Sequence, residues 1–252
     1  MHKLSVLFFL AGLALVLGAA LAQGGLAVFT GIASVPSNNF TTAASFDTPT
    51  PTATATATST PTPTPTATPT PTPTPTPSNT GFLSCAANAA VTTNSGDNNG
   101  FQLNPGNACA DDAAFAEDTN SGSNTNTSCT NTGKDRHQFY NYGFSVPAGS
   151  TINGIELRLD AWADGTGGSP FMCAELSWDG GTTWTAVKTS PTLTTSQATY
   201  ILGTASDTWG RTWSSGDFSN ANFRVRITNV ASSTSRDFRL DWAAVQVTYT
   251  PP

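Results

Sequence analysis

Charged residues are scarce in this 252-residue chain, where Asp, Glu, Lys and Arg together make up 10%. Their balance is mildly acidic, with a formal net charge of −6, and the sequence shows no basic run. Nucleic-acid-binding surfaces need a concentrated basic face, so the composition argues against a nucleic-acid partner. Ser, Thr, Asn and Gly are plentiful instead. This is typical of a secreted β protein whose surface is hydrated by hydroxyls and amides.

Residues suited to acid–base catalysis are also few. After the first few residues the only histidine is His137, and the glutamates are Glu117, Glu156 and Glu175. A Ser–His–Asp triad would have to converge on His137, and the sequence has no G-x-S-x-G motif. A glycosidase needs two positioned carboxylates, and there is no E-x-D-x-x-E signature. We therefore expect a protein that is not an enzyme.

The four cysteines all lie in the C-terminal part of the chain, at Cys85, Cys109, Cys129 and Cys173. No C-x-x-C motif is present, so a zinc site is disfavoured. An even number of cysteines in an exported domain predicts two disulfides instead. Three pairings are open, and we favour Cys85–Cys109 with Cys129–Cys173 because these close the shorter loops.

The first 22 residues have the layout of a signal peptide. A short basic start is followed by the apolar run Leu4–Ala22, which ends in Ala20-x-Ala22 directly before Gln23. The run is long for a signal peptide, so an uncleaved N-terminal anchor is the alternative. Either way we expect residues 23–252 to be secreted or displayed on the cell surface.

Residues 48–80 form a low-complexity linker of Thr-Pro and Thr-Ala dipeptides. Proline fixes φ and lacks a backbone donor, so we expect neither helix nor sheet. An extended polyproline II-like rod at about 3.1 Å per residue would span roughly 90 Å. The linker therefore predicts a stalk that lifts a domain away from the cell envelope, with its threonines as candidate O-glycosylation sites.

A short segment, residues 23–47, precedes the stalk. Leu26–Val35 has the composition of one or two strands, and Asn38-Asn39-Phe40-Thr41-Thr42-Ala43 follows. This Asn-x-Phe-x-x-Ala pattern resembles the mature N-termini of camelysin-type matrix and fibre proteins, in which the element begins a β-sandwich. A lone strand could pair with the sheet edge of another chain, which predicts self-association through residues 24–47. The alternative is a disordered N-terminus.

The composition of residues 81–252 is that of a folded domain, predicted to be an all-β antiparallel β-sandwich of jelly-roll type. Apolar and polar residues alternate in several stretches separated by Gly, Asn, Asp and Ser, as expected for strands with one buried face. A change of phase at Ala243-Ala244 predicts a β-bulge there. The loop-rich stretch Ser84–Lys134 holds three of the cysteines and is expected to depend on disulfides. The residues predicted to point inward are Ile155, Leu157, Leu159, Ala161, Phe223, Val225, Ile227, Phe238, Leu240 and Trp242.

The sharpest local motif runs from Ser177 to Trp184 and reads S-x-D-x-G-x-T-W. It resembles the Asp-box of sialidase propellers, where several copies lie away from the catalytic centre. Tight-turn chemistry explains its residues, so we expect a structural hairpin and no functional site. The residues that would build this hairpin are Ser177, Asp179, Gly181, Thr183 and Trp184.

All six tryptophans lie between residues 162 and 242. Exposed aromatic rings are how many carbohydrate-binding modules stack on sugars. Strand parity places Trp162 on an outward face, and the connection holding Trp209 and Trp213 has no periodicity that would bury it. We therefore take Trp162, Trp209, Arg211 and Trp213 as the candidate ligand-binding residues. Packing of these tryptophans in a wide core is the alternative.

Acidic side chains in a loop-rich exported domain are potential calcium ligands. The candidates are Asp111, Asp112 and Asp118, with Asp241 near the C-terminus. The ending Phe238-x-Leu240-Asp241-x-x-x-Val245-x-Val247 resembles the terminal strands of jelly-roll carbohydrate-binding modules, where an acidic residue often helps to hold a structural calcium. A solvated acidic loop without a cofactor is the default expectation.

The C-terminal region as a whole resembles uncharacterised secreted bacterial β-sandwich domains that follow Pro/Thr stalks. The residues that carry this resemblance are Ala221–Arg226 and Asp241-Trp242-x-x-Val245-x-Val247. The resemblance implies the architecture and an envelope setting, and it assigns no particular activity. Two functions follow: a structural or adhesive surface protein that contacts envelope or matrix components, or a carbohydrate-binding module displayed on a stalk.

Overall fold

The structure, a computed structural model, describes residues 74–252. The predicted signal peptide (1–22), the segment 23–47 and most of the linker 48–80 lie outside the described residues, so those interpretations stay predictions. None of the helices in 74–252 is long and apolar enough to cross a membrane. The strands are β1 (Ser78–Asn79), β2 (Leu83–Ser84), β3 (Ala87–Ala90), β4 (Ala116–Asp118), β5 (Arg136–Tyr140), β6 (Thr151–Ala163), β7 (Phe171–Ser177), β8 (Lys188–Thr189), β9 (Ala198–Thr204), β10 (Arg224–Val230) and β11 (Phe238–Thr250), and the short 3-10 helices are η1 (Pro105–Ala108) and η2 (Ser215–Phe218).

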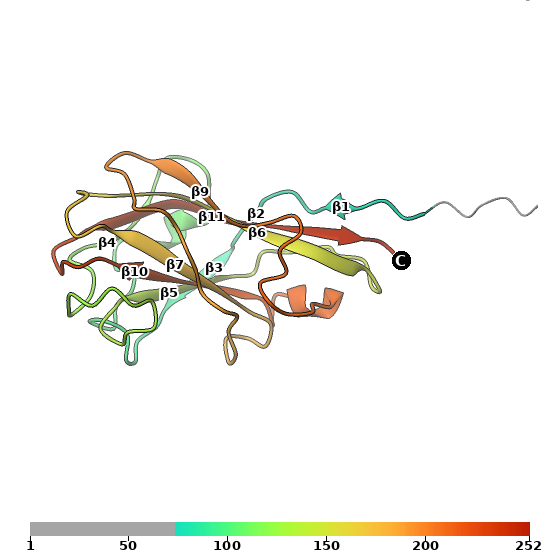
Figure 1. Cartoon of the computed structure of the whole chain (residues 1–252), viewed down its shortest axis with the longest axis horizontal. Helices are drawn as coiled ribbons and strands as arrows, with labels where there is room; N and C mark the ends of the chain where they lie inside the picture. Colours follow the sequence, from blue (N-terminus) through green and yellow to red (C-terminus); the bar gives the residue numbers. More distant parts are fainter. Residues whose placement is uncertain (1–73) are drawn as a thin grey trace, which may run out of the picture. The chain divides into compact units, whose positions relative to one another are not determined.

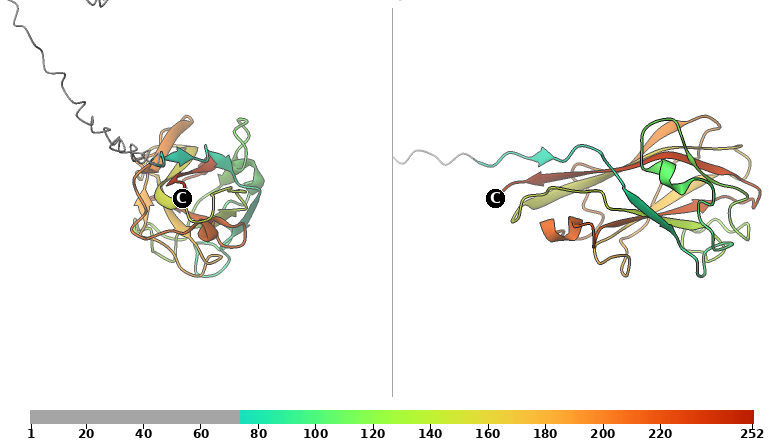
Figure 2. Two further views of the ribbon diagram at one scale, coloured as in Figure 1. Left: turned by 90° about the vertical axis from the view of Figure 1, so that its right-hand side faces the viewer. Right: turned by 180° about the vertical axis from the view of Figure 1, so that it is seen from behind.

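The strands form two antiparallel sheets that pack face to face (Figure 1). The first sheet has the order β1-β11-β6-β9, and β2 and β4 also pair with β11. The second sheet has the order β3-β5-β10-β7-β8. From β6 to β11 the chain passes repeatedly between the two sheets, as in a jelly roll (Figure 2). The predicted all-β sandwich is confirmed.

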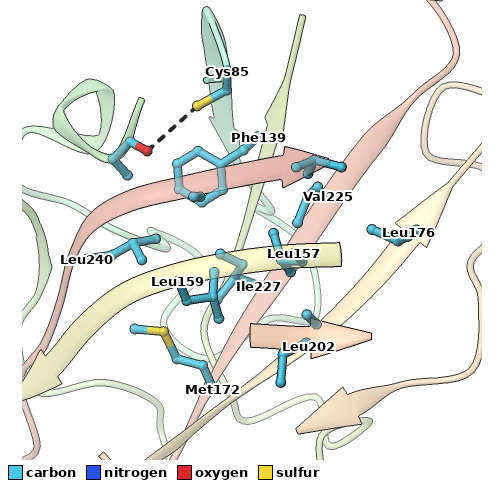
Figure 3. Packing of buried hydrophobic residues seen from close by; sticks show 14 of the residues in the cluster. Cys85, Phe139, Leu157, Leu159, Met172, Leu176, Leu202, Val225, Ile227 and Leu240 are labelled. Atoms are coloured by element: carbon cyan, nitrogen blue, oxygen red, sulfur yellow. Dashed lines mark hydrogen bonds between the residues drawn. The ribbon is translucent and has the colours of Figure 1, made fainter. Parts of the chain in front are cut away.

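The core lies between the inner faces of the two sheets (Figure 3). The alternating apolar residues of β6 all point inward, and Ile155, Leu157, Leu159 and Ala161 are fully buried. Val225 and Ile227 of β10 meet them from the second sheet, together with Phe139 of β5. Burial of apolar surface from both sheets supplies the main driving force for this fold.

The predicted bulge in β11 lies earlier than expected. The register between β11 and β6 shifts between Leu240 and Trp242, not at Ala243-Ala244. Asp241 is the extra residue, and the shift resets the phase so that Ala243 and the following valines point inward. Trp242 is consequently not a core residue. It is half-buried, and its Nε1 donates to the Ser84 hydroxyl at 2.8 Å.

The disulfide pairing favoured by loop length is the one observed, Cys85–Cys109 and Cys129–Cys173. The backbone of Cys109 forms an isolated antiparallel β-bridge with that of Trp242 in β11, so the first disulfide lies at the first sheet. The second disulfide attaches the Asn-rich loop 120–133 to β7 in the second sheet. Each disulfide thus fastens a stretch with few apolar residues to one of the two sheets.

Candidate functional site

Two of the predicted ligand-binding tryptophans are core residues, so their expected exposure is wrong. Trp209 is 2% exposed and Trp213 is 5% exposed. The indole of Trp209 donates to the Ile155 carbonyl at 2.9 Å, and that of Trp213 to the Thr208 carbonyl at 2.8 Å. The connection between β9 and β10 packs its aromatic rings into the core, so these residues confirm the alternative of core packing.

The other two candidates do not complete a platform with them. The Arg211 guanidinium lies 3.9 Å from the ring centroid of Trp178 and 4.4 Å from that of Trp213, so it contacts both rings itself. Trp162 is half-buried on β6, with its ring packed edge-on against Phe115. Trp162 lies seven residues along β6 from the Trp209 contact at Ile155, which is about 23 Å in a strand. One sugar unit could not bridge that distance.

The four predicted calcium ligands divide between two places. Asp111 and Asp112 lie near buried Asp241, where burial raises the pKa of Asp241 and the two neighbouring carboxylates raise it further. Asp118 lies elsewhere, in β4, where it pairs with Phe238 of β11, and its carboxyl lies beside that of Asp135. Within residues 74–252 no three Asp, Glu, His or Cys side chains stand together as metal ligands. Calcium binding stays a prediction.

A different group of side chains gathers on the outward side of the second sheet. Register places Arg226 of β10 between Gln138 of β5 and Glu175 of β7, and places Arg224 between Tyr140 and Ser177. We call this surface the arginine face. Its members are Arg136, Gln138 and Tyr140 of β5, Arg224, Arg226 and Thr228 of β10, and Cys173, Glu175 and Ser177 of β7.

A cavity of about 300 Å³ opens on the arginine face. Its lining includes the charged side chains Arg136, Glu175 and Arg226. Loops supply the rest of the wall. The complete lining is Val91, Thr93, Asn94, Cys129, Thr130, Arg136, Glu175 and Arg226. The site is therefore polar and charged, and the neighbouring strands β5, β10 and β7 of the second sheet form its floor.

Arg226 is held from two sides at this cavity. Its Nε and Nη2 both donate to Glu175 Oε2, at 2.9 and 2.7 Å. Its guanidinium carbon also lies 4.1 Å from the ring centroid of Trp184. A cation so close to an aromatic ring is attracted by the ring's quadrupole, so the pair restrains both side chains. The same arrangement recurs beside it, where Arg224 lies 4.1 Å from the ring of Tyr140.

Arg136 is fixed by backbone carbonyls instead of a carboxylate. Its Nη1 donates to the Asn94 carbonyl at 3.1 Å, and its Nη2 donates to the carbonyls of Cys129 and Asn131 at 3.1 and 2.6 Å. Burial lowers the pKa of Arg136, and the nearby charge of Arg226 lowers it further. Arg136 thus ties both loop walls to the floor and brings a second positive charge to the cavity.

The turn after β7 positions Trp184, and its hydrogen bonds are those expected from the sequence. Asp179 accepts from the backbone N–H groups of Thr182 and Thr183 at 3.0 and 2.8 Å, and Ser177 accepts from that of Gly181. The bonds from Thr183 hold the pKa of Asp179 at about 2. The turn predicted as purely structural therefore also carries the aromatic ring that contacts Arg226.

Comparison with known proteins gives little guidance. No protein-family model matches the chain, and no curated protein matches it. Among solved structures, CBM32 of AlyQ in complex with 4,5-unsaturated mannuronic acid is 16% identical, with a TM-score of 0.31 over 65% of this chain and 96% of that chain. Truncated AlyQ with CBM32 and alginate lyase domains is 14% identical, with a TM-score of 0.31, and the match covers 71% of this chain and 35% of that chain. The Clostridium thermocellum xylanase 10B CBM22-1–GH10 modules complexed with xylohexaose are 10% identical, with a TM-score of 0.28, and the match covers 56% of this chain and 25% of that chain. Similarity this distant assigns no ligand to the chain.

Proposed function

We propose that the protein is an exported surface or matrix protein that displays a polysaccharide-binding β-sandwich on its Thr/Pro stalk. The observation that carries this proposal is the arginine face, where a cavity lined by Arg136, Glu175 and Arg226 opens. The rings of Tyr140 and Trp184 lie against Arg224 and Arg226 on the same face. A sugar unit offers hydroxyls that bond to charged groups and an apolar ring face that packs on an aromatic side chain. The arginine face offers both kinds of partner side by side.

The cavity suits binding better than hydrolysis. Its volume of about 300 Å³ lies at the lower end of the usual range for small-ligand sites, which fits one sugar unit of a longer polymer. Glu175 is the one carboxylate in its lining, and that group already accepts two bonds from Arg226. Hydrolysis of a glycosidic bond requires a second positioned carboxylate. We therefore propose a non-catalytic role.

A polysaccharide array probed with the purified protein tests this function. Trp184→Ala should weaken binding of any bound polymer by about tenfold, since loss of a stacked aromatic ring costs ~1–3 kcal/mol in comparable contacts. Trp162→Ala is the matched control, because Trp162 is also half-buried but belongs to the first sheet. Absence of binding to every polymer would refute the proposed function. Loss of binding in Trp162→Ala alone would move the site to the first sheet.

An adhesive role follows directly if a stalk carries such a module, because the module would hold the surface to its polysaccharide. Self-association through residues 24–47 is a separate hypothesis about residues outside the described part. Sedimentation of the protein with and without residues 24–47 separates the two. Assembly that needs this segment would support a fibre or matrix role. A protein that stays monomeric and still binds polysaccharide would support adhesion without self-association.

A further inference from the structure

Building on the proposed function, we infer that the bound sugar unit carries a carboxylate, so that the ligand is a polysaccharide containing uronic acid. The cavity places two arginines against one glutamate. One positive charge is thus left without a partner in the lining, which matches the single negative charge of one uronate. A neutral sugar would leave this charge uncompensated.

The charge of the arginine face differs from that of the protein as a whole. The full chain has ten Lys and Arg residues and a net charge of −6. Three of those cations, Arg136, Arg224 and Arg226, share the arginine face with one acidic side chain, Glu175. The nearby Asp179 is turned into its own turn, where it accepts backbone N–H groups. A positive surface on an acidic protein attracts anionic polymers selectively.

The positive charge at the cavity is held in place by the fold. Arg136 is 8% exposed, and all the hydrogen bonds that its guanidinium makes within residues 74–252 go to backbone carbonyls. Neutral carbonyls orient a guanidinium without cancelling its charge. Arg226 lies close enough to lower the pKa of Arg136 further, so the two cations repel each other, and the carboxylates of Glu175 and Asp135 offset part of this effect. An anionic group in the cavity would relieve that repulsion.

The free atoms at the cavity suit a uronate better than a small inorganic anion. Arg226 donates to Glu175 through Nε and Nη2, so its Nη1 bonds to no residue in the described part of the chain. Both of those bonds end on Oε2, which leaves Glu175 Oε1 as an acceptor. A uronic acid unit has a carboxylate for Nη1 and hydroxyls for Oε1. Phosphate near neutral pH is partly a dianion, and Glu175 would repel its second charge.

Titration of the full-length protein with polygalacturonate and alginate, each beside its esterified form, tests the inference. Esterification removes the negative charge and keeps the sugar chain, so we expect about tenfold weaker binding of the esterified polymers, because a charge-assisted hydrogen bond is lost. Equal binding of the charged and esterified forms would overturn the inference and leave the proposed function standing. Binding to neutral polysaccharides only would also overturn the inference and leave the proposed function standing. Binding to no polysaccharide at all would refute the proposed function itself.

A pair of double variants locates the charge effect. Arg226→Gln with Glu175→Gln removes the ion pair at the cavity without changing the net charge of the protein. Arg239→Gln with Glu117→Gln is a close match on the first sheet, where Arg239 Nε donates to Glu117 Oε1 at 2.8 Å and lies near Phe115. We expect about tenfold weaker uronate binding in the first variant and less than about twofold change in the second. Equal effects in the two variants, or binding to dextran sulfate that matches binding to polygalacturonate, would indicate unspecific charge attraction and overturn the inference.

Discussion

Cys129 and Cys173 join the wall of the cavity to its floor: Cys129 lies in the wall-forming loop 120–133, and Cys173 lies on the outward side of β7. The pair closes a sequence separation of 44 residues. Because the loop has few apolar side chains, its position depends on this covalent bond and on the carbonyl bonds to Arg136. The disulfide therefore links the stability of the domain to the shape of the proposed site.

Replacement of both cysteines, Cys129→Ser with Cys173→Ser, should lower the free energy of unfolding by about 4 kcal/mol, as expected for a loop of this length. It should also weaken polysaccharide binding, since the wall of the cavity would no longer be fixed. Urea denaturation and affinity electrophoresis measure the two effects on the same protein.

The control is Cys85→Ser with Cys109→Ser, which closes a separation of 24 residues at the first sheet. Loop entropy predicts a similar loss of about 3.5 kcal/mol. Polysaccharide binding should be unchanged in this variant at temperatures where it stays folded. If the two variants lose binding equally, the disulfide at Cys129 has no special connection to the site.

Asp118 is a buried acid without enough partners. It is fully buried and accepts one bond, at Oδ2 from Asn229 Nδ2 at 2.8 Å, whereas Asp118 Oδ1 and Asn229 Oδ1 have no partner in the described part of the chain. Burial raises the pKa of Asp118 well above its ordinary value, and repulsion from Asp135 raises it further. Because the pKa is raised in the folded state, folding favours the protonated acid, and the ionised acid costs stability above the ordinary carboxyl range.

Asp118→Asn should therefore stabilise the protein at pH 7, by roughly 1–3 kcal/mol, since the amide can donate to Asn229 Oδ1 and needs no proton. The gain should shrink as the pH falls toward the ordinary carboxyl range, because the wild-type acid is then neutral in both states. Melting temperatures between pH 7.5 and 4.5 measure the difference. A lower melting temperature at pH 7, restored to equality by EDTA, would instead identify Asp118 as a calcium ligand.

His137 should lose its stabilising contribution in acid. Its Nδ1 accepts the Phe101 N–H at 3.1 Å, its Nε2 lies 2.9 Å from Asn88 Oδ1, and burial lowers its pKa to about 4. The neutral ring is thus favoured by folding, and its contribution is complete above pH 6.5 and lost as the pH falls to about 4.

His137→Asn cannot take up a proton in this range. It should destabilise the protein at pH 7, and this cost should shrink by up to about 3 kcal/mol between pH 6.5 and 4. The comparison of two unfolding curves at each pH cancels the opposite contribution of Asp135, whose pKa burial raises to about 6. A cost that stays constant with pH would mean that the imidazole protonates normally in the folded state.

Strand periodicity predicted the sheets and most of the core, because side chains on one face of a strand meet a single environment. Leu157 and Val225 are examples, since each alternates with charged neighbours. The same pattern misplaced the bulge of β11. Phe238, Leu240 and Trp242 alternate without interruption in sequence, and only pairing with β6 shows that Asp241 is the extra residue.

The site was harder to predict for a related reason. The outward parity of Arg224 and Arg226 could be read from their strand, but a sequence does not state which strands lie beside it. Arg136 and Glu175 are 90 and 51 positions away from Arg226 in the sequence, and the pairing of β10 with β5 and β7 brings all three to the same cavity. Trp209 misled in the opposite direction, because an irregular connection has no periodicity that reveals its burial.

The burial of Trp209 depends on one glycine. Gly203 of β9 has a φ of +85°, and a Cβ there would lie 2.3 Å from the Ile155 carbonyl oxygen and 2.8 Å from Trp209 Nε1. These are the two atoms of the hydrogen bond that anchors the indole, so only a residue without a side chain leaves room for it. Gly210 offers a comparison, because its φ of +77° is similar but a Cβ there would meet nothing within 4 Å.

Gly210→Ala should cost only the left-handed backbone penalty of about 1–2 kcal/mol. Gly203→Ala should cost that penalty and also displace the indole, for a total above about 3 kcal/mol. Urea denaturation followed by tryptophan fluorescence measures both the cost and the change around Trp209. Equal costs in the two variants would show that the Ile155 contact is unimportant. Because the indole belongs to the core, Gly203→Ala should still bind polysaccharide wherever it remains folded, which would separate Trp209 from the proposed site on the arginine face.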